Sequence, residues 1–214
     1  MSNIQPEKSA LVATLSETLP VKNAVSKPRG RPRSELAAVA VLDAAYRLTA
    51  TQGLKGATMQ AIAFESGVSK MTIYRWWEGR LELLIDAYLR QATLMLPITS
   101  DLSADQAILE HALRYLDALK GDLGRVQLAV LGGCLMENGN SEEFVKRYLD
   151  IRRKLGVCVI SRGQCSGCIA SKRPAEALYD QIYGTIFYRF QFGLNGLDKD
   201  FVVDLISSSF SDRV

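Results

Sequence analysis

The four cysteines are the residues of this sequence that could most directly do chemistry. Cys165 and Cys168 form a Cys-x-x-Cys pair, the spacing of redox-active or metal-binding thiols, whereas Cys134 and Cys158 stand apart. Zinc takes four ligands, and the single histidine, His111, is distant in the sequence and is expected at the rim of its helix. The pair lies between two predicted helices, without the strand-turn-helix setting of a thioredoxin. We therefore expect reduced structural thiols and no metal site, with a thiol or soft-metal sensor as the alternative.

Other catalytic groupings cannot be read in the sequence. It offers no Ser-His-Asp set, no carboxylate pair in a readable site and no glycine-rich loop that would cradle a phosphate. An enzymatic interpretation would rest on Cys165 and Cys168 as a thiol oxidoreductase. We expect a binding protein with no catalytic residues and no cofactor, and the oxidoreductase is the less favoured alternative.

A different chemistry is concentrated in the stretch GVSKMTIYRWWEGR, residues 67–80. At 100° per residue, Ile73 and Trp77 fall close together on a helix, and Val68 can join them as an anchor. The opposite side carries residue types that approach base edges and phosphates. These are Ser69, Lys70, Met71, Thr72 and Arg75, and Tyr74 can offer its hydroxyl to a phosphate at the flank. A solvated amphipathic helix is the alternative for this stretch taken alone.

The excess positive charge lies at the start of the chain. Residues 1–33 contain six Lys or Arg and two Glu, a balance of +4, whereas the whole chain carries +3. Four of the six cations stand in KPRGRPR, which includes Arg29, Arg31 and Arg33. Four prolines and this motif predict a disordered arm. A basic arm on a neutral body indicates contact with a polyanion, and a solubilising leader is the alternative.

The rest of the chain is predicted to be helical. Ser34 can cap a helix that ends at Gly53, and Thr58 can cap a short helix that ends at Gly67. Ser69 can cap again two residues later, which gives two short helices the spacing of a helix-turn-helix. Further helices are predicted over residues 81–96, 103–120, 124–138, 141–162, 174–194 and 199–212.

These elements predict an all-α protein with two domains behind the basic arm. Residues 34–80 form a three-helix helix-turn-helix domain, and residues 81–214 form a larger helical domain. The helix at 174–194 is apolar nearly all round and must be buried. Gly132 and Gly133, which are unusual inside a helix, are expected to mark a loosely packed helix crossing, with a kink or close packing beside a cavity as the alternative. No apolar run approaches a membrane span and no secretory signal is readable, so a cytoplasmic location is expected.

A series of short motifs runs through residues 41–84 in a fixed order. They are an aliphatic-Leu-x-Ala-Ala start at Val41–Ala45, Gly53 with Thr58, Ile62-Ala63, Gly67-Val68-Ser69, Ile73–Trp77 and Arg80. Together they resemble the N-terminal domain of TetR-family transcriptional repressors. Thr49 and Trp77 stand where that family usually has Phe, so the core is expected to repack around the larger ring. Arg80 stands where Lys is commoner, and both are cations that can meet a phosphate.

The resemblance implies a homodimer that places two Ser69–Trp76 helices in successive major grooves of double-stranded DNA. It implies phosphate contacts for Thr58, Tyr74 and Arg80, and contacts to bases or backbone for Lys70 and Thr72. The arm resembles an AT-hook, so Arg29, Arg31 and Arg33 would enter a narrow minor groove. Non-specific backbone contact by the arm is the alternative.

The resemblance also implies that residues 81–214 bind a small-molecule effector and dimerise. The pocket is expected among residues 81–162, and the helices at 174–194 and 199–212 are expected to form a four-helix dimer interface, with an intramolecular core as the alternative. The expected function is a repressor that an effector releases from its operator. A thiol-based or soft-metal sensor, and a DNA-binding protein without an effector, are the alternatives.

Overall fold

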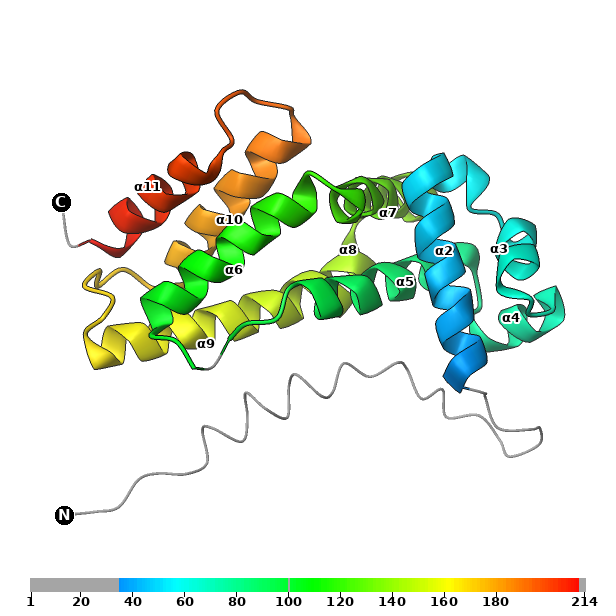
Figure 1. Cartoon of the computed structure of the whole chain (residues 1–214), viewed down its shortest axis with the longest axis horizontal. Helices are drawn as coiled ribbons and strands as arrows, with labels where there is room; N and C mark the ends of the chain where they lie inside the picture. Colours follow the sequence, from blue (N-terminus) through cyan, green and yellow to red (C-terminus); the bar gives the residue numbers. More distant parts are fainter. Residues whose placement is uncertain (1–34, 100, 212–214) are drawn as a thin grey trace, which may run out of the picture.

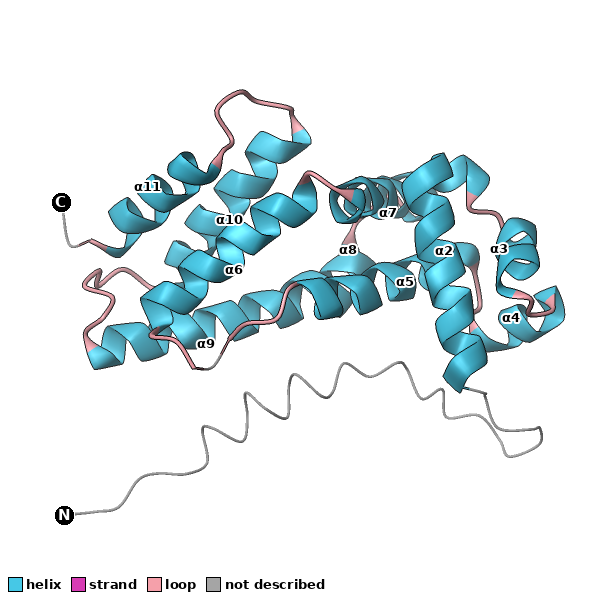
Figure 2. Ribbon diagram, in the orientation of Figure 1, coloured by secondary structure: helices cyan, strands magenta, loops and turns pink. Residues whose placement is uncertain are grey.

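The computed structural model describes residues 35–99 and 101–211, and all regular structure in these ranges is helical (Figure 1, Figure 2). The helices are α2 Glu35–Gly56, α3 Met59–Ser66, α4 Lys70–Trp76, α5 Arg80–Met95, α6 Ala104–Leu119, α7 Asp122–Asn138, α8 Glu142–Phe144, the π-helix η1 Val145–Leu149, α9 Asp150–Ser166, α10 Ala175–Gln191 and α11 Lys199–Phe210. The all-α prediction is confirmed. The predicted basic arm, with Arg29, Arg31 and Arg33, lies outside the described residues.

Helix α3 begins and ends, and helix α4 begins, at the residues that the sequence indicated, whereas Ser34, the predicted cap of α2, lies outside the described residues. Gly53 interrupts α2 with a left-handed φ of 66°, so the regular helix ends there although helical turns continue to Gly56. Thr58 accepts a hydrogen bond from the Ala61 backbone N–H, which caps α3, and Gly67 closes α3 at φ 67°. Ser69 caps α4 by accepting from the Thr72 backbone N–H at 3.2 Å. Local capping chemistry therefore sets where α3 ends and where α4 begins.

Helices α2, α3 and α4 form a compact head at one end of the molecule (Figure 1). Helix α3 packs against both α2 and α4, and Ile62 and Ile73 are completely buried between them. Thr49, where the family usually has Phe, is also buried, and its hydroxyl donates to the Ala45 carbonyl at 2.7 Å. The polar side chain therefore satisfies its own hydrogen bond inside α2.

Helices α5 to α11 form the body. Helix α5 leads from the head along the molecule, and α10 and α11 lie at the end far from α4 (Figure 1). Helix α6 packs against α9 and α11, and α10 packs against α9 and α11. In the described ranges, no helix combines the length and the apolar character that a membrane crossing needs.

The body differs from the sequence expectation at the predicted helix 141–162. A short α8 is followed by the π-helical segment η1, and α9 then continues to Ser166, where Gly167 closes it at φ 82°. The helical spacing of the apolar residues does not distinguish an α-helix from a locally widened one, so the sequence pattern missed this change. Single π-helical turns occur frequently at functional sites.

The head and the body meet where α2 packs against α5 and α7. A Cβ atom at Gly133 of α7 would lie 3.0 Å from Leu81 Cδ1 and 3.3 Å from Leu54 Cδ1. The expected loose crossing at the glycine pair is therefore wrong, because Gly133 marks a close contact between α7, α5 and the end of α2. Gly132 has open space around it.

Candidate nucleic-acid interface and effector pocket

Helix α4 presents two distinct faces. Ile73 is completely buried and Trp77, directly after the helix, is 2% exposed. Met71 on the opposite side is 81% exposed, and Tyr74 is 47% exposed. The helical-wheel prediction of an anchored inner face and an outward face is confirmed.

The outward face holds cations that the protein does not neutralise. Lys70 and Arg75 are exposed, and neither forms an ion pair with a residue in the described ranges. Lys70 Nζ lies 5.9 Å from the centre of the Tyr74 ring, so the two side chains lie on the same side of the helix. This side can contact a polyanion without breaking an internal ion pair.

The polar residues at the start of the two short helices have capping roles. Thr58 and Ser69 are exposed, and each side-chain oxygen already accepts one backbone N–H. The hydroxyls of Ser69 and Thr72 lie 2.8 Å apart. Both hydroxyl groups can still donate or accept at the surface, since a hydroxyl has two acceptor lone pairs and one donor.

Arg80 lies elsewhere than the other predicted DNA contacts. Its Nη1 donates to the Leu54 carbonyl at 2.8 Å, and its Nη2 pairs with Glu137 Oε1 at 2.6 Å. The side chain is therefore directed to the junction of the head with α7. A phosphate contact by Arg80 stays a prediction, and it would compete with the Glu137 ion pair.

Trp77 connects helix α4, the helix predicted to contact DNA, to the body. Its indole Nε1–H donates to Asp86 Oδ2 of α5 at 2.7 Å, and the other oxygen of Asp86 pairs with Arg147 of η1. Phe cannot make this hydrogen bond, so the departure from the usual family residue adds a polar contact as well as a larger ring. Sequence reasoning identified the ring but not its partners, which lie 9 and 70 positions further along the chain.

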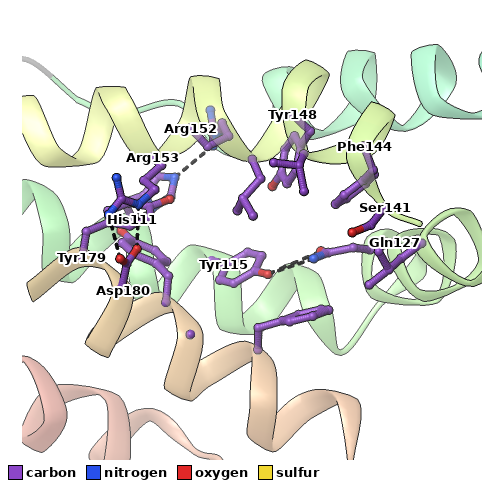
Figure 3. A pocket seen from close by; sticks show the side chains of 16 residues that line it. His111, Tyr115, Gln127, Ser141, Phe144, Tyr148, Arg152, Arg153, Tyr179 and Asp180 are labelled. Carbon is purple, nitrogen blue, oxygen red and sulfur yellow. Dashed lines mark hydrogen bonds and ion pairs between the residues drawn. The ribbon is translucent and has the colours of Figure 1, made fainter. Parts of the chain in front are cut away.

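A cavity of about 410 Å³ lies inside the body (Figure 3). Its walls come from α6, α7, the α8–η1–α9 segment and α10. The lining residues are His111, Tyr115, Gln127, Leu131, Ser141, Phe144, Val145, Tyr148, Leu149, Arg152, Arg153, Tyr179, Asp180, Tyr183, Gly184 and Phe187. Most of the walls fall within the expected range 81–162, but α10 supplies a wall that was not expected and α5 supplies none.

His111 is part of this cavity, so its expected place at a helix rim is wrong. The residue is 6% exposed, with Nδ1 2.7 Å from the Tyr183 hydroxyl and Nε2 2.9 Å from Arg152 Nη2. Burial and the charges of Arg152 and Arg114 lower the pKa of His111 to about 3. The ring is therefore neutral at physiological pH. Its apolar neighbours at helical spacing, Ile108 and Tyr115, were the sequence signal for an inward position.

The tyrosines of the cavity are neutral hydrogen-bonding groups. Burial raises the pKa of Tyr115 and Tyr183 well above the usual value and raises that of Tyr179. Gln127, which is 4% exposed, donates from Nε2 to the Tyr115 hydroxyl at 3.2 Å and accepts at Oε1 from the Tyr88 hydroxyl of α5 at 2.9 Å. The cavity therefore combines apolar rings with fixed polar groups, as ligand sites commonly do.

The charged residues of the cavity gather near His111 (Figure 3). Arg153 pairs with both oxygens of Asp180, at 2.8 and 2.7 Å. Asp180 is the one carboxylate among the lining residues, and this pairing keeps it from acting as a free base. The arrangement is suited to binding a molecule, and the lining residues contain no activated nucleophile.

The cysteines lie apart from the cavity lining. Cys134 is buried, whereas Cys158, Cys165 and Cys168 are exposed, and all four are free. Cys165 lies in the last turn of α9 and Cys168 follows Gly167, so the pair stands between two helices as predicted. Within residues 35–99 and 101–211, no group of three or more His, Cys, Asp or Glu side chains could hold a metal ion.

Comparisons with known proteins identify the class of this protein. The model of the bacterial regulatory proteins of the tetR family matches residues 41–87, and that of the tetracyclin repressor-like C-terminal domain matches residues 96–208. The chain is 32% identical over 182 residues to the uncharacterized HTH-type transcriptional regulator YdeS of Bacillus subtilis (strain 168), covering 85% of this chain and 92% of that protein. The chain therefore belongs to the TetR family of DNA-binding transcriptional regulators, which are not enzymes.

Solved structures share the fold. The TetR family transcription regulator SCO0332 superposes with a TM-score of 0.72 at 23% identity, covering 84% of this chain and all of that one. FadR from Bacillus subtilis, solved in complex with stearoyl-CoA, has a TM-score of 0.60 at 20% identity, covering 82% of this chain and 99% of that one. At these identities the likeness concerns the fold.

Proposed function

We propose that the protein is a repressor that binds its operator as a homodimer and leaves it when a small molecule occupies the cavity. The observation that carries this proposal is the position of α7. Gln127 and Leu131 of α7 line the cavity, and Gly133 of the same helix lies against Leu54 of the head. Glu137 of α7 pairs with Arg80, which in turn donates to the Leu54 carbonyl. A ligand that displaces α7 therefore acts directly on the part of the molecule that holds α4.

In this proposal α4 of each copy lies in a major groove. Lys70, Met71, Thr72 and Arg75 face the bases and the backbone, because this face is exposed and its cations are unpaired within the described ranges. Tyr74, Thr58 and Ser69 contact phosphates from the flanks. Arg29, Arg31 and Arg33 of the basic arm contribute phosphate or minor-groove contacts.

A second connection supports coupling between the cavity and the head. Arg147 belongs to η1, the segment whose Val145 and Tyr148 line the cavity, and it pairs with Asp86, which accepts from Trp77. The side chains of Arg147 and Asp86 are 13% and 12% exposed. An ion pair so little exposed is costly to break, since Asp86 would be left without a cationic partner. A shift of η1 is therefore transmitted to Asp86 and to the base of α4.

The homodimer is proposed to form through α10 and α11. Several large apolar side chains on these helices and the loop between them are exposed in the single chain. They are Tyr188, Phe192, Leu194 and Val203. Helices α10 and α11 lie on the side of the body away from α4, so a pairing there leaves both heads accessible (Figure 1). Because α10 also lines the cavity, the ligand and the partner copy would contact the same helix.

Binding to the DNA upstream of the protein's own coding region tests the DNA-binding part of the proposal. We expect fluorescence anisotropy to show tight binding of that DNA, weaker binding of random DNA, and a steep loss of affinity with added salt. Equal binding of both DNAs, or binding insensitive to salt, would contradict sequence-specific recognition. Sedimentation of the complex, with two chains expected per operator, tests the homodimer.

A further inference from the structure

Arg152 is a positive charge in the cavity with no acidic partner. In the described ranges no carboxylate lies within ion-pair distance of its guanidinium, whereas the neighbouring Arg153 holds Asp180. Of its five N–H donors, the two on Nη2 are used by the Leu96 carbonyl and by His111 Nε2. The N–H groups on Nε and Nη1 have no partner in the described part of the chain. The protein thus supplies a charge and leaves three donors unused.

The tautomer of His111 frees a further donor. Arginine only donates, so His111 Nε2 must accept from Arg152, and the neutral ring carries its proton on Nδ1. Nδ1–H then donates to the Tyr183 oxygen at 2.7 Å. The hydroxyl hydrogen of Tyr183 is consequently left to donate to another group. Arg152 and Tyr183 both line the cavity, so both can serve the same occupant.

We infer that the effector is an anionic molecule with an apolar body, such as an aliphatic or aromatic carboxylate, whose charged oxygens accept from Arg152 and Tyr183. This inference rests on the proposed function, because it names the ligand class of the same cavity. A carboxylate matches the unused donors of a guanidinium, which can bind it in a bidentate manner. His111 is a positioning residue that orients both groups.

The rest of the cavity fits the apolar body. Leu131, Phe144, Val145 and Phe187 line the walls, and 410 Å³ is near the lower end of the range for small-molecule sites. Tyrosine rings can also hold a quaternary ammonium through cation–π contacts. The charges of the lining oppose a cation, however, since Arg152 and Arg153 are balanced only by Asp180.

The test uses the full-length protein and three matched pairs of probes: octanoate with octanamide, 3-phenylpropionate with its amide, and salicylate with salicylamide. Choline serves as the cationic probe. Isothermal titration at pH 7.5 is expected to show at least tenfold tighter binding of one or more carboxylates than of the matching amide. No measurable binding of choline is expected. Preference for the amides or for choline, or no binding by any carboxylate, would overturn the inference.

Variants locate the binding site. Arg152→Gln is expected to reduce the carboxylate-to-amide affinity ratio to near one, and Tyr183→Phe is expected to reduce it severalfold. The matched control is Lys154→Gln, which removes an exposed cation of the same helix that does not line the cavity and should leave the ratio within about twofold. Because Arg152 also supports the Leu96 carbonyl, Tyr183→Phe keeps the test decisive if Arg152→Gln does not fold. An unchanged ratio in a folded Arg152→Gln or in Tyr183→Phe would place the anion elsewhere.

Operator binding without any probe separates this inference from the proposed function. A protein that binds its upstream DNA but prefers amides or choline would overturn the anionic effector alone. A protein that prefers carboxylates but ignores its upstream DNA would overturn the repressor alone.

Discussion

The head and the body of this protein use polar residues in opposite ways. On α4, Lys70 and Arg75 are exposed and form no ion pair in the described ranges, so they are available to a partner that supplies the opposite charge. In the cavity, His111 and Gln127 are buried and already hydrogen-bonded, and Arg152 is held on one side by two internal acceptors. DNA has a fixed, repeating charge that an open surface can meet, whereas a small ligand must be recognised by pre-positioned groups.

The largest expected effect comes from replacing Trp77, the buried residue that holds α4 against the body. Trp77→Ala deletes a ring that is 2% exposed together with its hydrogen bond to Asp86. We expect the free energy of unfolding to fall by about 3–5 kcal/mol, as for other buried aromatic residues, and operator binding to be lost. Urea denaturation measures the change. Met71→Ala, at an exposed position of the same helix, is the control and should change stability by no more than about 0.5 kcal/mol.

Acidification tests the buried polar residues of the body. The folded-state pKa of His111 is lowered to about 3, so between pH 3 and about 6.5 the unfolded chain binds a proton that the folded chain does not. Stability from this residue is therefore complete above pH 6.5 and is lost as the pH falls toward 3. The expected slope is about 1.4 kcal/mol per pH unit within that window.

The His111→Asn variant isolates this contribution, because the carboxylates of the protein titrate in both proteins. The free energy of unfolding of the wild type should fall steadily relative to that of His111→Asn as the pH falls from 6.5 to 4.5. A difference that does not change with pH would mean that His111 is accessible and protonated in the folded state.

Removal of one exposed cation, Arg75, tests the outward face of α4. Arg75→Ala is expected to weaken operator binding about tenfold and, if Arg75 meets a phosphate, to lower the slope of log affinity against log salt by about 1. Anisotropy titrations at several salt concentrations give both quantities. Lys154→Ala, which removes another exposed cation, on α9, is the control. A similar loss of operator affinity in both variants would indicate a general charge effect and not a DNA-binding surface on α4.

Variants of the ion pair between Arg80 and Glu137 test the junction between the head and the body. Glu137→Gln removes the carboxylate and keeps the shape of the side chain, and we expect it to reduce effector-induced release severalfold. Effector affinity and fold should be retained. Arg80→Ala answers a separate question: it weakens DNA binding only if Arg80 also contacts a phosphate. Release assays on both variants distinguish a coupling role from a DNA-contact role.

The smallest expected effect concerns the Cys-x-x-Cys pair. Cys165 and Cys168 lie at the far end of α9, apart from the cavity lining and from the head. Replacing both by Ser should leave operator affinity and effector release within about twofold. Loss of regulation in the double variant, or loss of DNA binding in the wild type after oxidation with diamide, would support the thiol-sensor alternative instead.

The head was largely predictable from the sequence because its geometry is local. The caps Thr58 and Ser69, the left-handed Gly53 and Gly67, and the buried position of Ile73 follow from short motifs and helical spacing. The all-helical body was predictable in the same way. What the sequence indicated least well was the interruption of a helix by η1, since widening of one turn leaves little trace in the apolar pattern.

The cavity was not predictable in detail because its contacts join distant segments. His111 meets Tyr183, 72 positions away, and Arg152, 41 positions away, while Arg80 meets Glu137, 57 positions away. Helical periodicity states which side of a helix is buried, but tertiary packing decides which other helix covers it. That α10 lines the cavity, and that Arg80 lies at the junction, could therefore be learned only from the structure.

The proposed function requires the cavity and the DNA-contacting helix α4 of the head to be coupled. The most direct test measures operator affinity by anisotropy with the cavity empty and with it saturated by the carboxylate that binds most tightly. Coupling predicts at least a tenfold loss of operator affinity, and reciprocity requires saturating operator DNA to weaken binding of that carboxylate by the same factor. Operator affinity that is unchanged while the cavity is fully occupied would contradict the claim.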